Sequence, residues 1–100
     1  MILIKEDKLI TRISIIIPTL NESNNLPLLL SDLSEINNIS EILIIDSTST
    51  DKTKDIALIN GTRFYKINKN NRGLQLNYGA EKAKGEWLFF IHADSRLKFN

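Results

Sequence analysis

The sequence feature that most constrains the fold of this chain is a set of short apolar runs, each of which ends in polar residues or in proline. They occupy residues 14–18, 41–46 and 86–91, and the first ends at Pro18. Proline has no N–H to donate to a strand ladder, so the first strand is expected to end there. Runs that are apolar on both faces are typical of parallel strands covered above and below. The pattern therefore predicts a buried parallel sheet.

Helical patterns separate these runs. Leucine and isoleucine recur at helical spacing over residues 26–36. A short helix is expected over about 51–59, and another helix over 72–84. Polar and apolar residues alternate over residues 62–67, which predicts a further strand. Gly85 is expected to end the last helix, at its C′ position. The order β-α-β-α-β-α-β predicts an α/β, Rossmann-like parallel sheet with right-handed crossovers.

Composition excludes several classes of protein. The 100 residues hold 13 Lys and Arg against 12 Asp and Glu, which argues against a nucleic-acid binder with a basic face. The lack of cysteine excludes disulfides and thiolate metal sites. The start is too charged for a signal peptide, and residues 1–12 resemble an edge strand or a tail. A cytoplasmic location is expected, or a peripheral membrane location for a longer parent protein.

Polar residues follow the carboxyl end of each predicted strand, at residues 19–22, 46–47, 68–72 and 92–94. Open parallel sheets bind ligands beyond the carboxyl ends of their strands, near the topological switch point. Caps and turns are the ordinary alternative use of such Asp, Asn, Ser and Thr residues. The convergence of four polar strand ends favours a binding site at this edge.

The sequence lacks the glycine-rich loops GxGxxG and GxxxxGK[ST], so a dehydrogenase or a P-loop enzyme is disfavoured. A bound phosphate would then need a metal and Arg72, which lies at a predicted helix start where the N–H groups already favour anions. Asp94 is the natural ligand for Mg²⁺ or Mn²⁺, since both prefer oxygen. His92 is expected to be a hydrogen-bonded neighbour or an optional ligand; the two would share a face if the strand continued to Asp94.

These segments resemble those of the family 2 glycosyltransferases, which have the GT-A fold. The matching segments are SIIIPTLNE at 14–22, EILIIDSTSTD at 41–51, RGLQLNYGA at 72–80 with AKGE at 83–86, and LFFIHAD at 88–94. The third segment and the His-Ala-Asp ending are most similar to a small bacterial subgroup. That subgroup has His where most relatives have the first Asp of the DxD motif.

The resemblance implies roles for single residues. Pro18, Thr19 and Glu22 would line the nucleoside pocket, and Asp46 would lie near the base or ribose. One departure is that Asp46 is followed by Ser47-Thr48, where the family commonly has two acids, or an acid and Gly, before its Ser.

The diphosphate end of the ligand is assigned in the same way. Arg72 would approach the base or the diphosphate. Asp94, with His92 as an optional ligand, would hold a divalent metal, Mn²⁺ or Mg²⁺, that bridges the diphosphate oxygens. Such a metal neutralises the charge that develops on the leaving group.

The implied reaction transfers a sugar from a UDP- or GDP-sugar to an acceptor hydroxyl, in an inverting displacement that needs a carboxylate base. Residues 1–100 would form the nucleotide-sugar-binding part of a glycosyltransferase domain, truncated before the acceptor-binding half. The base is expected beyond Asn100, the acceptor is unknown, and the fragment alone is expected to be inactive.

Two other functions stay open. A non-catalytic nucleotide-binding or assembly module would suit a chain without an acceptor half. A receiver-like signalling domain with Asp46 as phosphoacceptor fits less well, because the first strand ends in Pro18-Thr19 rather than in an acid pair. The apolar region 87–99 is expected to need cover, so the isolated chain should self-associate as a two-fold dimer.

Overall fold

A computed structural model describes residues 12–98, so most of the expected N-terminal edge strand or tail lies outside the described residues. The elements in order are β1 (Ile13–Thr19), α1 (Leu26–Leu33), β2 (Ile39–Ser47), α2 (Thr53–Ile59), β3 (Arg63–Ile67), α3 (Arg72–Lys82) and β4 (Trp87–Phe90). The four strands pair in parallel in the order β3-β2-β1-β4. The predicted α/β, Rossmann-like parallel sheet is confirmed.

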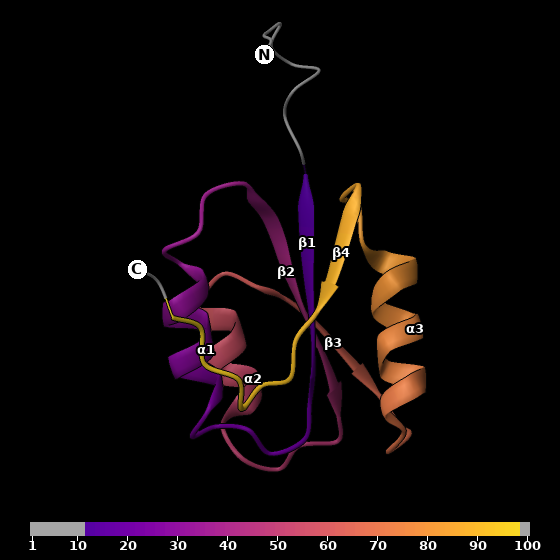
Figure 1. Cartoon of the computed structure of the whole chain (residues 1–100). Coiled ribbons are helices and arrows are strands. Elements are labelled where there is room, and N and C mark those ends of the chain that lie inside the picture. Colours follow the sequence, from indigo (N-terminus) through magenta and orange to yellow (C-terminus); the bar gives the residue numbers. More distant parts are fainter. Residues whose placement is uncertain (1–11, 99–100) are drawn as a thin grey trace, which may run out of the picture.

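Helices cover both faces of the sheet (Figure 1). Ile15 and Ile17 of β1 belong to the core cluster that includes α1 and α2, while Ile16 belongs to the cluster that includes α3. Successive side chains of a strand point to opposite faces, so a strand covered on both sides must be apolar at every position. This explains the unbroken isoleucine run.

The chain changes direction across the sheet after β3. The crossovers through α1 and α2 lead outward from β1 to β2 and β3, and α3 then returns the chain to pair β4 with the free edge of β1. The topological switch point therefore lies between β1 and β4. Ligand sites in open parallel sheets lie beyond the carboxyl ends of the strands at such a point.

Two helix ends differ from expectation. α1 ends at Leu33 rather than near residue 36, although Ile36 still packs against the core. The prediction that Gly85 closes α3 is wrong, because α3 ends at Lys82 with Ala83 as its C-cap. Gly85 is needed for another reason: a Cβ there would come within 2.5 Å of Ser14 Oγ and 2.8 Å of Ser14 N.

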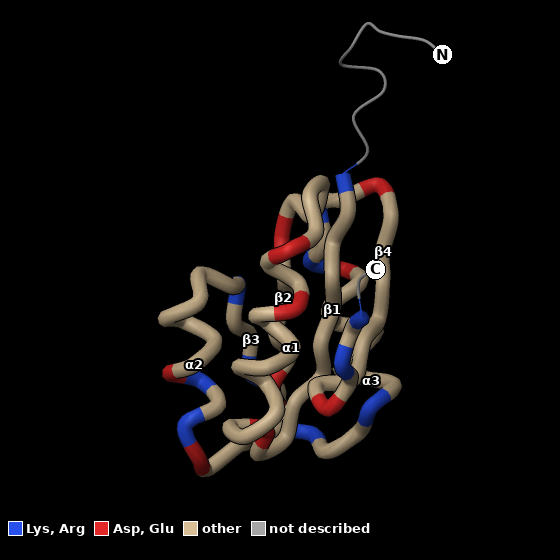
Figure 2. Tube along the Cα trace, turned by 60° about the vertical axis from the view of Figure 1, so that its left-hand side comes forward, with Lys and Arg blue, Asp and Glu red and all other residues tan. Residues whose placement is uncertain are grey.

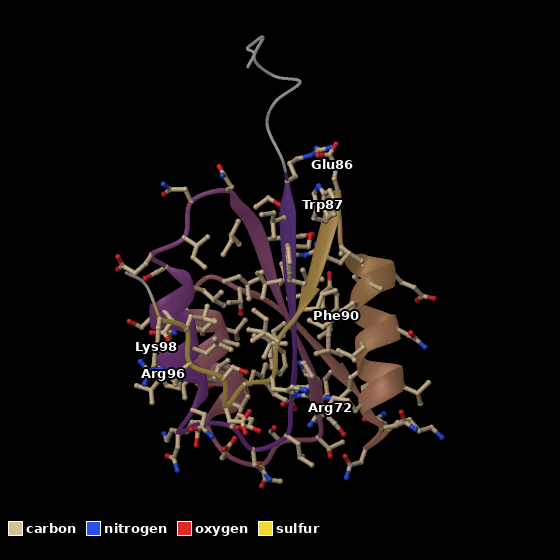
Figure 3. The ribbon with its side chains drawn as sticks, in the orientation of Figure 1. Arg72, Glu86, Trp87, Phe90, Arg96 and Lys98 are labelled. Atoms are coloured by element: carbon tan, nitrogen blue, oxygen red, sulfur yellow. The ribbon has the colours of Figure 1, made fainter. Side chains whose placement is uncertain are left out.

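The segment after β4 runs across the sheet to α1 (Figure 1). Arg96 forms a bidentate ion pair with Asp32 of α1, with distances of 2.8 and 3.1 Å, and the Leu97 N–H donates to the same carboxylate. These hydrogen bonds, that from Arg96 first, lower the pKa of Asp32 to about 2. Figure 3 shows Arg96 and Lys98 beside α1, far from Trp87 at the other end of the sheet.

Charged residues of both signs are interspersed along the trace (Figure 2). No helix among residues 12–98 is long and apolar enough to cross a membrane.

Candidate functional site

A cavity of about 270 Å³ opens at the carboxyl end of β1, beside the switch point. Its lining comes from the loop after β1, the loop before α3 and the first turns of α3: Pro18, Thr19, Leu20, Glu22, Asn70, Arg72 and Gln75. Four of the residues singled out from the sequence, Pro18, Thr19, Glu22 and Arg72, thus line one cavity although they come from segments far apart in the chain.

Gln75 is buried where α3 meets the strand ends, with only 4% of its surface exposed. Its Nε2 donates to the carbonyl of Thr19 at 3.1 Å and to the carbonyl of Ile45 at 2.8 Å, so it joins the ends of β1 and β2. Gln75 belongs to the matching segment 72–80, but no role was predicted for it from the sequence. Its position three residues after Arg72, on the same helical face, was the available signal.

Asp46 lies at the end of β2 and is 2% exposed. Its Oδ1 accepts from Thr19 Oγ1 at 2.6 Å and from Ser49 Oγ at 2.5 Å, and its Oδ2 accepts from the Ser49 N–H at 2.8 Å. The carboxylate is therefore occupied in joining the ends of β1 and β2, and it is not among the residues that line the cavity. Its burial also argues against a phosphoacceptor role.

The loops after β1 and β2 hold each other in place. Asn21, with φ of +54°, accepts on Oδ1 from the Thr50 N–H at 2.8 Å. Asp51 accepts from the Ser23 N–H at 3.0 Å and from the Thr53 N–H at 2.9 Å. Desolvation raises the pKa of Asp51, but the hydrogen bonds from Thr53 and Ser23 outweigh it and lower the pKa to about 2. The rim of the cavity is thus a hydrogen-bonded unit of two loops.

Arg72 and His92 meet at the switch point, where the start of α3 faces the end of β4. A guanidinium can only donate, so a ring nitrogen of His92 is the acceptor in this contact. In this arrangement His92 is a hydrogen-bonded neighbour of Arg72. Figure 3 shows Arg72 at the end of the sheet opposite Glu86 and Trp87.

Asp94 lies in a turn beyond β4, exposed to solvent. Because β4 ends at Phe90, the condition under which His92 and Asp94 would share a strand face is not met. Within residues 12–98 no group of three or more His, Cys, Asp or Glu side chains could hold a metal ion. A single carboxylate suits a metal whose remaining ligands are phosphate oxygens and water, which is a common arrangement for Mg²⁺.

The family model for glycosyl transferase family 2 matches residues 14–100. The chain belongs to glycosyl transferase family 2. The match covers nearly all of β1, every later element and all the residues that line the cavity.

Curated family relatives include two bacterial enzymes. The 4,4'-diaponeurosporenoate glycosyltransferase of Staphylococcus haemolyticus is 33% identical, over 93% of this chain and 27% of its own length. A PGL/p-HBAD biosynthesis glycosyltransferase of Mycobacterium bovis is 37% identical, over 84% of this chain and 36% of its own length. The chain therefore spans about a quarter to a third of the length of these relatives.

Solved structures of glycosyltransferases share the fold. The S. aureus TarS 1-349 structure superposes with a TM-score of 0.78 at 23% identity, over 85% of this chain and 28% of that one. The Mycobacterium tuberculosis glucosyl-3-phosphoglycerate synthase in complex with UDP gives a TM-score of 0.76 at 24% identity, over 85% of this chain and 34% of that one. The family 2 sequence thus folds here as the corresponding part of a GT-A-like domain.

Proposed function

We propose that this chain binds the nucleoside diphosphate of a sugar donor, and that its parent protein transfers the sugar to an acceptor hydroxyl. The observation that carries the proposal is the cavity at the switch point, which gathers Pro18, Thr19, Glu22 and Arg72 from two of the family 2 segments. A cavity at this place is where open parallel sheets bind nucleotides.

The nucleoside occupies the cavity in this proposal, and the diphosphate lies at its mouth. Arg72 is exposed at the first position of α3, so its guanidinium and the free N–H groups of the helix start act on the same anion. The Asn71 side chain already caps the Leu74 N–H, which leaves the other N–H groups of the first turn for the ligand. A charged group of this kind binds phosphate more strongly than a neutral donor does.

A divalent metal, Mn²⁺ or Mg²⁺, completes the proposed site, with Asp94 as its protein ligand and His92 as an optional one. When bound, such a metal would neutralise the charge that develops on the leaving diphosphate. Support comes from the glucosyl-3-phosphoglycerate synthase structure that contains Mn²⁺ and UDP, and from another that contains Mn²⁺ and UDP-glucose. These ligands favour a UDP-sugar as donor, with a GDP-sugar as the alternative.

The rest of the reaction is proposed for the parent protein. We place the acceptor site and the carboxylate base of an inverting transfer in residues that follow Asn100. The His-Ala-Asp sequence at residues 92–94 supports membership of the subgroup that has His in the DxD motif. In the structure this histidine contacts Arg72.

For the 100-residue chain alone we propose self-association through β4. Trp87, Phe89 and Phe90 are 60%, 49% and 49% exposed, and within residues 12–98 the one strand that pairs with β4 is β1. An open strand edge with exposed aromatic residues favours pairing with another chain.

Calorimetric titration of the chain with UDP and with GDP, each with and without Mn²⁺, tests the proposed binding. Binding should depend on the metal. Asp94→Asn should abolish this metal-dependent binding and leave the fold intact, while Asp55→Asn, at an exposed acid on α2, should leave the binding unchanged. His92→Ala should reduce metal affinity less than Asp94→Asn does. Binding that is independent of metal, or a preference for NAD, would contradict the proposal.

The arginine is tested in the same titration. Arg72→Ala should weaken binding by about 1.5–3 kcal/mol if its guanidinium donates a charged hydrogen bond to the ligand. Arg12→Ala serves as the matched control, because Arg12 lies at the amino end of β1, at the end of the sheet opposite the cavity. Equal affinities of the parent and the Arg72 variant would show that the anion binds elsewhere.

A further inference from the structure

The geometry points to Gln75 as the residue that selects the base of the bound nucleotide, by accepting a hydrogen bond from a ring N–H. This inference rests on the proposed function and names a determinant of its specificity. It predicts a preference for uracil and guanine, whose rings carry an N–H at the pairing edge. Cytosine and adenine carry an acceptor nitrogen at that position.

The orientation of the Gln75 amide follows from its partners. Both atoms that it contacts, the carbonyl oxygens of Thr19 and Ile45, are acceptors, so the group that faces them must be the NH₂. Both of its hydrogens are thereby used. The carbonyl oxygen Oε1 then points away from the strand ends, in a direction fixed by two hydrogen bonds.

Oε1 is open to the cavity. No hydrogen bond to it comes from the described residues, yet no buried side-chain oxygen or nitrogen among them lacks a partner. Oε1 must therefore be accessible to solvent, although Gln75 as a whole is only 4% exposed. The cavity that Gln75 lines provides that access. A fixed neutral acceptor thus faces the space proposed for the nucleoside.

The base is the part of the nucleotide that reaches this oxygen. Arg72 is exposed at the mouth of the cavity, whereas Gln75 lies three residues further along α3, about 4.5 Å along the helix axis, and is buried. If the diphosphate is held at the mouth, the opposite end of the nucleotide is the end that extends to Gln75. Asp46 is 2% exposed and is not among the residues that line this cavity, whereas Gln75 is.

Discrimination follows from the cost of an unpaired buried acceptor. A ring N–H donates a hydrogen bond to Oε1. The ring nitrogen of cytosine or adenine at that position is itself an acceptor, so its lone pair would oppose that of Oε1 and no hydrogen bond would form between them. A site built to pair with a substrate donor rejects analogues that lack it. Leaving such a buried group unpaired should weaken binding by about tenfold or more.

Titration of the 100-residue chain with four nucleoside diphosphates in Mn²⁺ tests the inference. UDP should bind about tenfold or more tightly than CDP, and GDP about tenfold or more tightly than ADP, each pair being matched in size. Equal affinities within both pairs would overturn the role of Gln75 and leave the proposed function standing. Failure of every diphosphate to bind would overturn both.

Variants assign the preference to Gln75. In Gln75→Met, which removes the acceptor at similar volume, the ratio of UDP to CDP affinity should fall to near one. Asn77→Met, an exposed amide on the same helix, should keep the parent ratio. The assignment would be overturned if Gln75→Met still bound UDP more tightly than CDP. It would also be overturned if the parent lost affinity for 2′-deoxy-UDP but bound CDP as tightly as UDP.

A measurement on the unaltered chain covers the case in which Gln75→Met does not fold. The imino proton of bound UDP should be protected from exchange and should show a through-space NMR contact with the side-chain amide of Gln75. An imino proton that exchanges at the rate of free UDP would overturn the inference without any variant.

Discussion

Single carboxylates hold the loops that border the cavity. Asp46 joins the end of β1 to the loop after β2, and Asp51 joins the loop after β1 to the start of α2. The hydrogen bonds to Asp51 favour its charged form and lower its pKa, so protonation of Asp51 weakens the link that it makes. The rim of the cavity should therefore be the part of the site most sensitive to acid.

Asp51 gives this sensitivity a definite range of pH. Its pKa is about 2 in the folded chain, below the ordinary value of 3.8, so the stabilisation is complete above the ordinary value and is lost as the pH falls toward about 2. Asp51→Asn should lower the midpoint of urea unfolding at neutral pH. Near pH 2 the midpoints of the variant and the parent should agree. Asp55→Asn is the control, and a constant difference between parent and Asp51→Asn across this range would contradict the assignment.

Thr48 adopts a backbone conformation that a β-branched residue rarely takes, with φ of +58° directly after β2. Glycine adopts it without a steric cost, so Thr48→Gly should raise the free energy of unfolding by about 1 kcal/mol. Chemical denaturation measures the change. Thr50→Gly, at a neighbouring position without positive φ, should instead lower stability, and the same sign for both variants would show that the Thr48 backbone is not strained.

At the scale of elements, close contact between α3 and the sheet sets the position of the cavity wall. A Cβ on Gly79 would lie 2.5 Å from Ile16 Cγ2 and 3.1 Å from Ile45 Cγ1, so the helix backbone rests directly on the central strands. One turn earlier Gln75 bonds to the ends of the same two strands. Contact and hydrogen bonds together fix where Arg72 and Gln75 project.

Gly79→Ala tests this contact. Alanine favours a helix by about 1 kcal/mol over glycine, but the added methyl group must push α3 away from β1 and β2, and such overpacking costs about 1–3 kcal/mol. The variant should therefore be less stable than the parent in thermal unfolding and should bind UDP more weakly. Asn77→Ala, on the exposed face of the same helix, should be neutral or stabilising. A stabilised Gly79→Ala would show that α3 sits further from the sheet.

Glu41 ties several elements together at the other end of the sheet. Its carboxylate accepts from Ser14 Oγ at 2.6 Å, from Arg63 at 2.5 Å and from the Lys84 N–H at 2.5 Å. Desolvation raises its pKa, but these hydrogen bonds outweigh it and lower the pKa below the ordinary range. β1, β2, β3 and the end of α3 are thereby joined away from the cavity.

The sequence predicts elements better than it predicts contacts. Apolar runs and helical spacing are local, so the order of strands and helices and the polar strand ends could be predicted. The role of Gly85 could not, because it depends on the approach of Ser14 from far away in the chain. The place of Gln75 was missed for the same reason, since its partners Thr19 and Ile45 lie on other elements.

At the scale of the whole molecule, the strand order leaves β4 at an edge. An apolar cavity of about 300 Å³ adjoins it, lined by Ile13, Ile15, Leu33, Ile36, Ile39, Phe89, Ile91 and Leu97. Phe89 lines that cavity, while Leu88 packs against the cluster beneath α3. Both faces of β4 are therefore only partly covered by the elements described, while the cavity lined by Arg72 and Gln75 lies at the carboxyl end of β1.

This open edge predicts that the 100-residue chain self-associates at micromolar concentrations, as a two-fold dimer that buries the region from Trp87 onward. Sedimentation at several concentrations should give a mass above the 11.4 kDa of one chain. Phe89→Lys places a charge on the edge strand and should shift the chain toward monomer. Ile59→Lys, at an 84% exposed position on α2, should not. A monomer across the whole concentration range would contradict the proposed dimer.

The same chain should bind a donor without transferring its sugar. Three of the acidic side chains near the cavity already have other roles: Asp46 and Asp51 hold the loops, and Asp94 is the proposed metal ligand. Glu22, which lines the cavity, is proposed to contact the nucleoside. An inverting transfer needs a carboxylate free to take the acceptor proton, which we place after Asn100. Incubation with a UDP-sugar and Mn²⁺ should therefore yield no transfer beyond the rate of donor hydrolysis. Transfer to an added acceptor would mean that one of these carboxylates, or Glu22, serves as the base, and Glu22→Gln would then identify it.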